Sequence, residues 1–365
     1  MKILTVVGAR PQFIKASTVS RAIAERAQLT EVLVHTGQHY DQNMSDVFFE
    51  ELGIPNPAYH LGIGSGSHGV QTGLMLPAVE SVILRERPDI VLVYGDTNST
   101  LAGGLAAAKL RVPVAHVEAG LRSFNRGMPE EINRILVDHL SAYLFAPTES
   151  AGQQLLTEGF PPTTIHIVGD VMFDASRFFA SKEDLRVLET AGLCPGEYVL
   201  ATIHRAENTD DPTRLHNITE ALLSIADRAP ILFPVHPRTS QALGNELACI
   251  EAHPNIRVAA PLSYLAMIAA ERYARLVVTD SGGVQKEAFF FGVPCVTLRT
   301  ETEWVELVEL GWNTVLPPTS SANIASGIAG RLDAPLPKSG AQPFGDGNAA
   351  FKIVDILARF AGTPA

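Results

Sequence analysis

The sequence has few cysteines and no apolar run long enough to span a membrane. Its three cysteines, Cys194, Cys249 and Cys295, are far apart and form no C-x-x-C pair, so we expect buried free thiols in a reducing compartment. The first apolar run, residues 3–7, is too short for the core of a signal peptide, and no uncharged segment approaches the length of a membrane span. These absences predict a cytoplasmic protein without a membrane partner.

Positive charge is also scarce. The 365 residues include 28 Lys and Arg against 39 Asp and Glu, a formal net charge of −11. Nonspecific binding to nucleic acid or to an anionic membrane requires a basic face, so we expect this protein to bind neither. An anionic ligand would need a local basic pocket.

Short apolar runs that alternate with amphipathic stretches fill the chain, which is typical of βαβ units and parallel sheets. A chain of this length is expected to form two domains. We predict a Rossmann-like domain over 1–170, a crossing segment over 171–196, where the strand signal lapses, and a second Rossmann-like domain over 197–345. Residues 346–365 are expected to include a helix that packs back on the first domain. The expected strands are residues 2–8, 31–36, 89–94, 113–117, 143–147 and 164–168, then 198–203, 230–235, 256–260, 275–279 and 294–298.

The segment HVEAGLR at 116–122, followed by PEEINR at 129–134, has an unusual density of carboxylates and guanidiniums. Glu118 comes directly after a buried strand, at the end where ligands bind in open α/β sheets. Carboxylates there can move protons, while arginines hold anions. We therefore predict acid–base roles for Glu118 and Glu130. The alternative for Glu130 and Arg134 is an i,i+4 surface pair on a helix that starts at Pro129.

Two further strand ends in the first half carry candidate residues. Asp96 ends an apolar strand within YGDTNST, although Asp96 or Thr97 could instead cap the following helix. The first strand is followed by GARPQFIK, where a helix N-terminus together with Arg10 and Lys15 could bind an anion. A turn whose Arg and Lys face solvent is at least as good an interpretation of that segment.

In the second half, His204 and His236 each end a strand and each have an arginine nearby, which favours a phosphate pocket over two isolated structural histidines. The strongest local motif is TDSGGVQKEA at 279–288. A Ser-Gly-Gly sequence at a helix N-terminus offers a hydroxyl and open N–H groups to a phosphate, and Glu287 could reach a ribose diol. The alternative is that Ser281 is an N-cap and Glu287 is solvated.

Metal binding and hydrolase chemistry find little support. His116 and Glu118 share a strand face, but no third ligand is apparent. The Gly-x-Ser-x-Gly nucleophile motif is absent.

Together these motifs resemble the non-hydrolysing UDP-N-acetylglucosamine 2-epimerase family. GARPQFIK, TGQH at 36–39, GDTNST, HVEAGLR, PEEINR, HR at 204–205, VHP, TDSGG-x-Q-x-E and PFGDGNAA at 343–350 occur in the family's order over nearly the whole chain. The resemblance implies a GT-B fold, in which two Rossmann-like domains face each other across a cleft. It also implies a homodimer and UDP bound between the domains.

The resemblance implies inversion at C2 of a UDP-N-acetyl sugar with no NAD, other cofactor or metal. A base removes the C2 proton as UDP leaves C1, giving a 2-acetamidoglucal, and UDP re-adds while a proton reaches the opposite face. By resemblance, Asp96, Glu118, Glu130 and His204 are catalytic. Residues matched to UDP or sugar binding are Arg10, Lys15, Arg134, His236, Ser281, Gly282, Gly283 and Glu287.

The chain departs from the family pattern in three places. Pro-Gln-Phe-Ile-Lys replaces the usual Pro-Glu-Ala-Ile-Lys, the segment 123–128 is shortened, and Glu303-Trp304-Val305-Glu306 replaces a familiar Arg-Pro-Glu.

UDP-GlcNAc is the main substrate hypothesis, for surface polysaccharide or related aminosugar synthesis. The alternative is UDP-2,3-diacetamido-2,3-dideoxyglucuronate, whose carboxylate could meet Arg126. A GT-B glycosyltransferase, a hydrolysing epimerase and a UDP-sugar sensor are weaker alternatives.

Overall fold

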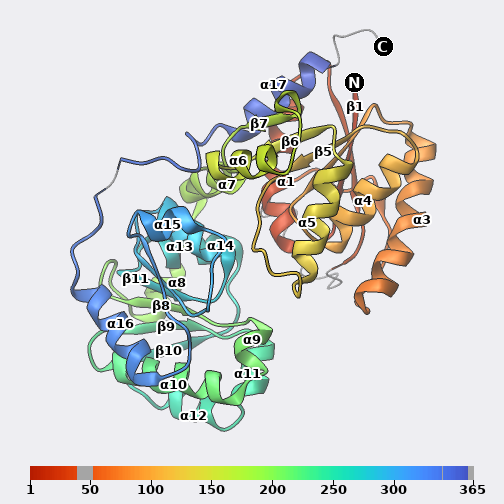
Figure 1. Ribbon diagram of the computed structural model, residues 1–365. Helices are drawn as coiled ribbons and strands as arrows, with labels where there is room; N and C mark the ends of the chain where they lie inside the picture. Colours follow the sequence, from red (N-terminus) through yellow and green to blue (C-terminus); the bar gives the residue numbers. More distant parts are fainter. Residues whose placement is uncertain (39–51, 339, 361–365) are drawn as a thin grey trace. The chain divides into compact units, whose positions relative to one another are not determined.

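A computed structural model describes residues 1–38, 52–338 and 340–360. The chain divides into two compact units (Figure 1), which are described separately below. Unit 1 comprises Met1–Ala175 and Gln342–Ala365, and unit 2 comprises Ser176–Ala341. The chain therefore leaves unit 1 once and returns to it.

Unit 1 contains, among its described residues, a seven-stranded parallel sheet in the order β3-β2-β1-β4-β5-β6-β7. A sheet that grows outward in both directions from its first strand is doubly wound, and its ligands bind where the order reverses, between β1 and β4. The strands are β1 (Lys2–Val7), β2 (Thr30–His35), β3 (Tyr59–His60), β4 (Ile90–Tyr94), β5 (Val114–Val117), β6 (Tyr143–Ala146) and β7 (Ile165–Ile167).

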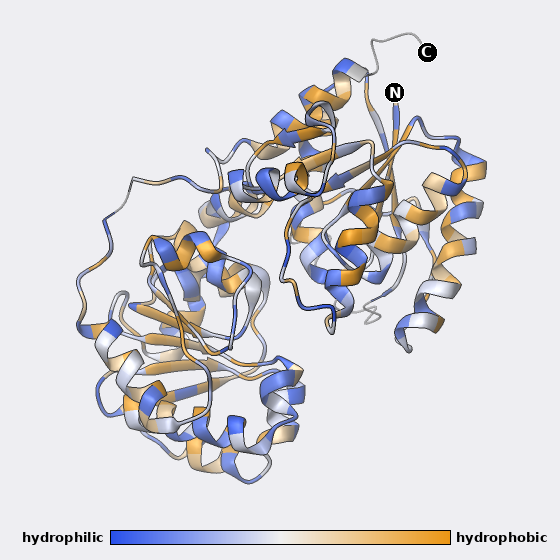
Figure 2. Ribbon diagram, viewed as in Figure 1, coloured by the Kyte–Doolittle hydropathy of each residue, from blue (hydrophilic) through white to orange (hydrophobic). Residues whose placement is uncertain are grey.

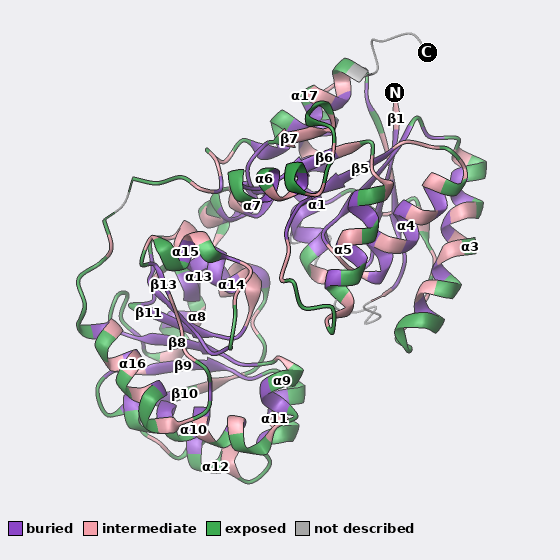
Figure 3. Ribbon diagram, in the orientation of Figure 1, coloured by how far each residue is buried: buried purple, intermediate pink, exposed green. Residues whose placement is uncertain are grey.

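The central strands of unit 1 are apolar on both faces because helices cover both sides of a parallel sheet. Every residue of β4 is buried, and β1 is buried from Ile3 onward. Figure 2 shows these strands as hydrophobic and Figure 3 shows them as buried. The helices are α1 (Arg10–Ala24), α3 (His68–Glu86), α4 (Asn98–Lys109), α5 (Pro129–Leu140), α6 (Glu149–Thr157), η1 (Pro162–Thr164), α7 (Val171–Phe179) and α17 (Ala349–Phe360).

Helix α17 packs against α1 although more than 300 residues separate them in sequence. Its N-terminus is held by Asp174, whose carboxylate accepts the backbone N–H groups of Ala349 and Ala350 at 3.1 and 2.8 Å. Burial raises the pKa of Asp174 to about 6, although these two hydrogen bonds oppose the shift. Ile353, Val354 and Leu357 of α17 are fully buried.

Unit 2 repeats the same topology with a six-stranded parallel sheet, in the order β10-β9-β8-β11-β12-β13 over its described residues. The order reverses between β8 and β11. The strands are β8 (Val199–Thr202), β9 (Ile231–Pro234), β10 (Ile256–Ala259), β11 (Leu276–Thr279), β12 (Cys295–Thr297) and β13 (Asn313–Val315).

Helices cover both faces of this sheet, with one apolar cluster centred on Ile218, Leu222 and Phe233 and another on Leu200, Val277 and Ala288. The helices are η2 (Ala180–Lys182), α8 (Arg186–Ala191), α9 (Ala206–Thr209), α10 (Pro212–Ala226), α11 (Pro237–Leu243), α12 (Glu246–Glu251), α13 (Tyr264–Arg272), α14 (Gly282–Phe290), α15 (Val305–Glu309) and α16 (Ser321–Asp333).

The predicted α/β class with two Rossmann-like sheets is confirmed. Each strand expected from the sequence is present, and the short strands β3 and β13 were not predicted.

The expectation of buried thiols is correct for Cys295 and wrong for Cys194 and Cys249, which are exposed and free. In the described part of the chain, no helix combines the length and apolarity that crossing a bilayer requires.

Candidate active site

Three predicted residues of unit 1 follow β1, β4 and β5, three neighbouring strands at the reversal of strand order or next to it. Lys15 lies in the helix after β1, Asp96 follows β4, and Glu118 follows β5. Parallel strands end at one edge of the sheet, so these side chains project from the same edge. His39 of the TGQH motif lies outside the described residues.

Glu118 and Lys15 form an ion pair, and both side chains are nearly buried. Glu118 has a positive φ of 76°, a conformation that non-glycine residues adopt at some energetic cost and that clusters at functional sites. A side chain at position 95 would crowd this pair, because a Cβ there would lie 3.2 Å from Glu118 Oε2 and 3.3 Å from Lys15 Nζ, and the φ of +62° at Gly95 also disfavours other residues. Glycine at 95 therefore lets the two turns approach each other.

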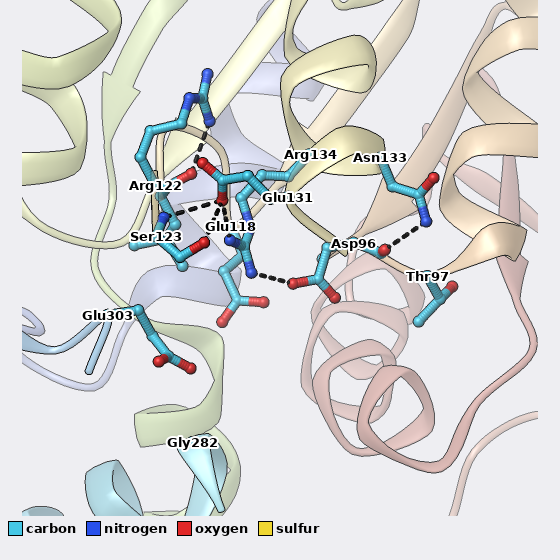
Figure 4. Close-up of polar contacts among 12 residues, drawn as sticks. Asp96, Thr97, Glu118, Arg122, Ser123, Glu131, Asn133, Arg134, Gly282 and Glu303 are labelled. Carbon is cyan, nitrogen blue, oxygen red and sulfur yellow. Dashed lines mark hydrogen bonds and ion pairs between the residues drawn. The ribbon is translucent and has the colours of Figure 1, made fainter. Parts of the chain in front are cut away.

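Arg134 connects Asp96 to a second carboxylate, Glu131 (Figure 4). Its guanidinium lies 2.5 Å from Asp96 Oδ2 and 2.6 Å from Glu131 Oε2. Burial opposes ionisation of Glu131, but hydrogen bonds from Ser123 and the charge of Arg134 outweigh it and lower its pKa. The two carboxylates in turn raise the pKa of Arg134 despite its burial. Asp96 is thus held in place by a buried guanidinium, with part of its own surface open to solvent.

Glu130, the predicted catalytic residue of α5, is exposed, whereas its neighbour Glu131 is buried. The alternative of a surface pair between Glu130 and Arg134 is wrong, because Arg134 is buried and pairs with Glu131 and Asp96. Glu131 was missed by the sequence analysis. The cap of α4 is Thr97, whose hydroxyl accepts the N–H of Thr100, so Asp96 is not required as a cap.

The first turn differs from the expected anion cradle. The N–H groups of Gly8 and Ala9 both donate to Gln12 Oε1, at 2.8 and 3.1 Å, instead of remaining open to a ligand. The amide nitrogen of Gln12 donates to the carbonyl of Tyr94 and to Thr100. Gln12 therefore ties the turn after β1 to the turn after β4. Arg10 is the first residue of α1 and is half-buried.

In unit 2, the buried carboxylate of Asp280 organises the turn that carries His204. It accepts the N–H groups of His204 and Arg205 at 3.0–3.2 Å and an amide N–H of Asn208 at 3.1 Å. The side chain of His204 is partly exposed, at 45%. Loss of hydration on its protein-facing side lowers the pKa of the imidazole. The charge of Asp280 opposes this shift, and the charges of Arg205 and His236 add to it. A neutral imidazole near pH 7 can both accept and deliver a proton.

The other predicted residues of unit 2 lie after β9 and β11. His236 follows β9, and Ser281, Gly282, Gly283 and Glu287 belong to the turn after β11 and to α14. His236 is the N-cap of α11, and its ring centroid lies 6.3 Å from that of His204. Ser281 precedes α14 and makes no side-chain cap hydrogen bond, so the N-cap alternative is not supported by its hydroxyl. Glu287 is buried on α14, which removes the alternative of a solvated carboxylate.

The sequence analysis did not assign a role to Glu303. This residue follows β12 in the sequence, and in the fold its carboxylate lies beside Gly282, the first residue of α14. A Cβ at Gly282 would lie 2.4 Å from Glu303 Oε1. The same carboxylate pairs with Arg299 at 2.7 Å and lies 4.0 Å from Arg205. Both arginines lower the pKa of Glu303, although its burial acts in the opposite direction. The N-terminus of α14 is thus bordered by a fixed carboxylate and two guanidiniums.

This geometry predicts different effects at two adjacent glycines. Gly282→Ala should lower the free energy of unfolding of unit 2 by about 1–3 kcal/mol, because the new methyl group displaces the buried carboxylate of Glu303. Gly283→Ala should change it by less than about 1 kcal/mol, since its nearest neighbours would be at 3.8 and 3.9 Å. Urea unfolding of both variants measures the difference, and equal effects would contradict the crowding at Gly282.

Among the described residues, no group of three or more His, Cys, Asp or Glu side chains is arranged to hold a metal ion. Unit 1 has two carboxylate–cation pairs, Glu118 with Lys15 and Asp96 with Arg134. Unit 2, taken separately, has His204 followed by Arg205. Such groups can exchange protons and bind anions.

Residues 21–358 match the protein family described as UDP-N-acetylglucosamine 2-epimerase. The chain belongs to this family, and it is a UDP-N-acetylhexosamine 2-epimerase of the non-hydrolysing type. The family resemblance predicted from the sequence is confirmed.

Similar proteins cover almost the whole chain. The UDP-2,3-diacetamido-2,3-dideoxy-D-glucuronate 2-epimerase of Pseudomonas aeruginosa is 54% identical over 98% of this chain and 100% of its own length. A UDP-N-acetylglucosamine 2-epimerase of Methanocaldococcus jannaschii is 45% identical over 98% of this chain and 99% of its own. The crystal structure of the M. jannaschii enzyme with UDP-GlcNAc and UDP has a TM-score of 0.90, covering 98% of this chain and 100% of that chain. The fold is accordingly GT-B-like.

Proposed function

We propose that this enzyme epimerises UDP-2,3-diacetamido-2,3-dideoxyglucuronate at C2. The observation that carries the proposal is the 54% identity, over nearly the full length of both chains, to the P. aeruginosa enzyme named for that substrate. This substrate differs from UDP-GlcNAc by an acetamido group at C3 and by a carboxylate in place of the C6 hydroxymethyl group. A protein that uses it needs a cation near the sugar.

Arg126 supports this substrate on chemical grounds. It lies in the turn between β5 and α5 and is exposed. The turn is fixed at its start, because Glu131 accepts the N–H groups of Ser123 and Phe124 at 2.9 and 3.0 Å. A guanidinium on an ordered turn binds a carboxylate with less loss of conformational entropy than one on a loose loop.

The carboxylates of unit 1 are proposed to move the C2 proton. One carboxylate takes the proton, the C2–H electrons form the C1=C2 bond, and the C1–O bond to UDP breaks. In the return step UDP adds to C1 while a second group delivers a proton to the opposite face of C2. Asp96, Glu118 and Glu130 are the proposed carboxylates, with Lys15 and Arg134 as the cations that hold Glu118 and Asp96.

Unit 2 is proposed to hold the nucleotide. Ser281, Gly282, Gly283 and Glu287 are assigned to the diphosphate and ribose, and Arg10 of unit 1 to the diphosphate. His204 is assigned as an additional proton-transfer group, and His236 to the phosphates. The reaction needs no redox cofactor in this scheme, because the elimination and the addition are balanced.

Proton NMR in D2O tests the reaction and the substrate together. The enzyme is incubated separately with UDP-2,3-diacetamido-2,3-dideoxyglucuronate and with UDP-GlcNAc, and deuterium at C2 and the C2 epimer are recorded. We expect exchange and epimer with the diacetamido uronate. Turnover of UDP-GlcNAc alone would replace the proposal with the second candidate, which the 45% identical M. jannaschii UDP-N-acetylglucosamine 2-epimerase favours. Exchange with neither sugar would refute both.

The role of Arg126 has a separate test. Arg126→Met should lower kcat/KM for the diacetamido uronate by about 10–100-fold, the effect of losing one charge-assisted hydrogen-bonded pair. Arg126→Lys should keep part of the activity. The control is Arg228→Met, an exposed arginine of unit 2 that pairs with Asp333, for which we expect no change. An unaltered kcat/KM in Arg126→Met would remove this residue from the site.

We also propose that two copies of the chain associate through unit 1. Helix α4 contacts both α3 and α5, and the three lie side by side in Figure 1. Exposed apolar residues on the outer helices include pairs spaced by four positions, as in a helix-packing seam. They are Val70, Leu74 and Leu84 on α3 and Ile132 and Leu136 on α5, each 46–59% exposed. Exposed apolar side chains on two helices of the same unit suit a two-fold contact.

Light scattering coupled to size exclusion tests the association. The wild type should elute with twice the 39.2 kDa chain mass, and the variant Leu74→Glu/Leu136→Glu should be a monomer. Leu185→Glu, at an apolar residue of unit 2 that is 44% exposed, should remain a dimer. A monomeric wild type would overturn the proposal.

A further inference from the structure

A buried histidine, His116, connects the two turns that carry the proposed acid–base residues. It lies in β5, one residue before the strand ends, and is fully buried. Its Nδ1 is 2.7 Å from Asp138 Oδ1, and its Nε2 is 2.7 Å from the carbonyl oxygen of Gly95. Asp138 lies in α5 and is also fully buried.

Both ring nitrogens of His116 contact oxygen atoms of unit 1. A carboxylate oxygen and a carbonyl oxygen accept hydrogen bonds, so both partners suit an imidazole ring held in one orientation. Burial opposes ionisation of Asp138, but His116 and Arg122 outweigh it and lower the pKa of this carboxylate.

The second oxygen of Asp138 holds the neighbouring turn. Asp138 Oδ2 accepts the N–H of Gly120 at 3.1 Å and pairs with Arg122 at 2.7 Å. Arg122 donates two further hydrogen bonds to Glu158, at 2.8 and 2.7 Å. Short contacts thus join the four side chains of this cluster, His116, Asp138, Arg122 and Glu158.

The turn after β5 contains a strained residue. Glu118 has a φ of +76°, and a non-glycine residue keeps such a conformation only where surrounding contacts fix it. Gly95, which immediately precedes Asp96, and Gly120 also have positive φ values, +62° and +84°, which glycine adopts without strain. The Asp138 carboxylate reaches one turn through His116 and the other directly, through Gly120.

We propose that His116 and Asp138 are positioning residues whose buried contact fixes Asp96 and Glu118 relative to each other for proton transfer at C2. The proposal rests on the proposed function, because it assumes that these two carboxylates act on one sugar carbon. His116 itself has no route to substrate, since both of its nitrogens are already bonded inside unit 1.

A double-mutant cycle tests the proposal. In His116→Gln the amide can still donate to the Gly95 carbonyl, but its oxygen then faces the Asp138 carboxylate. We expect kcat to fall about 100-fold, as for a displacement of about 1 Å at a reacting group. KM and UDP affinity, measured by calorimetry, should stay within about threefold, because the proposed nucleotide residues are mostly in unit 2.

The double variant His116→Gln/Asp138→Asn restores the hydrogen bonds without charge. The amide introduced at position 138 can donate to the amide oxygen introduced at position 116, while its own oxygen still accepts from Gly120 and Arg122. We expect kcat within about tenfold of wild type, hence at least about tenfold above the single variant. This recovery separates positioning from general damage to the fold, and it remains measurable if the single variant is insoluble.

His139→Gln is the matched control, because His139 adjoins Asp138 in sequence but is exposed, and it should keep wild-type kcat. Undiminished kcat in His116→Gln, or a double variant below about 1% of wild type, would overturn the proposal. Wild-type turnover is measured first on both nucleotide sugars. A failure of the proposed function therefore appears in the wild type, before any variant is compared.

Discussion

Glu118→Gln should lower C2 hydrogen exchange in D2O by about 10²–10⁴-fold, the usual contribution of a positioned general acid or base. The glutamine amide has nearly the shape of the carboxylate but cannot accept or release the C2 proton. Lys15, the partner of Glu118 in the structure, keeps its place in α1, and UDP binding should therefore persist. Exchange is measured by proton NMR and UDP binding by calorimetry.

Glu149→Gln provides the control for this variant. Glu149 is an exposed carboxylate at the first position of α6, and its replacement should leave exchange unchanged. If Glu118→Gln retained wild-type exchange, Glu118 would not be a catalytic carboxylate, and the strained backbone at this position would need another explanation.

Arg134→Met should lower both stability and turnover. The guanidinium is the shared partner of Asp96 and Glu131, and its removal leaves Glu131 buried and without its charge partner. Loss of one member of a buried ion pair costs about 3–5 kcal/mol of unfolding free energy. Turnover should fall about 100-fold or more, because Asp96 is no longer held in place. Urea unfolding and C2 exchange measure the two effects.

A second substitution separates these two roles of Arg134. Arg134→Met/Glu131→Gln removes the unpaired buried charge, so it should regain part of the lost stability while turnover stays low. Arg134→Lys should fall between wild type and Arg134→Met in both measurements, since an ammonium cannot reproduce two fixed guanidinium contacts. Full turnover in Arg134→Met would contradict the role assigned to the pair with Asp96.

The fold was largely predictable because buried parallel strands are continuous apolar runs with an unambiguous length. β4 is an example, since IVLVY can bury both faces and ends at a glycine. The same pattern placed Asp96, Glu118 and His204 at strand ends. β3 was missed because it contains only two residues. β13 has three residues, as β7 and β12 do, but its sequence Asn-Thr-Val contains no apolar run.

Details of the site that depend on helix rotation were less predictable. Adjacent helix residues point about 100° apart, so the sequence PEE does not reveal which glutamate faces inward, and the structure buries Glu131 while Glu130 is exposed. Gln12 could not be assigned to the N–H groups of Gly8 and Ala9 without the position of its side chain. Glu303 is distant from Gly282 in the chain, and only folding brings the two together.

The return of the chain to unit 1 has a consequence for synthesis on the ribosome. Helix α17 is translated after every strand of both sheets, yet it packs against α1, which precedes it by more than 300 residues. Until α17 emerges, α1 lacks this contact, and Asp174 lacks the two N–H donors of Ala349 and Ala350. The packing of unit 1 is therefore completed only after unit 2 has been synthesised.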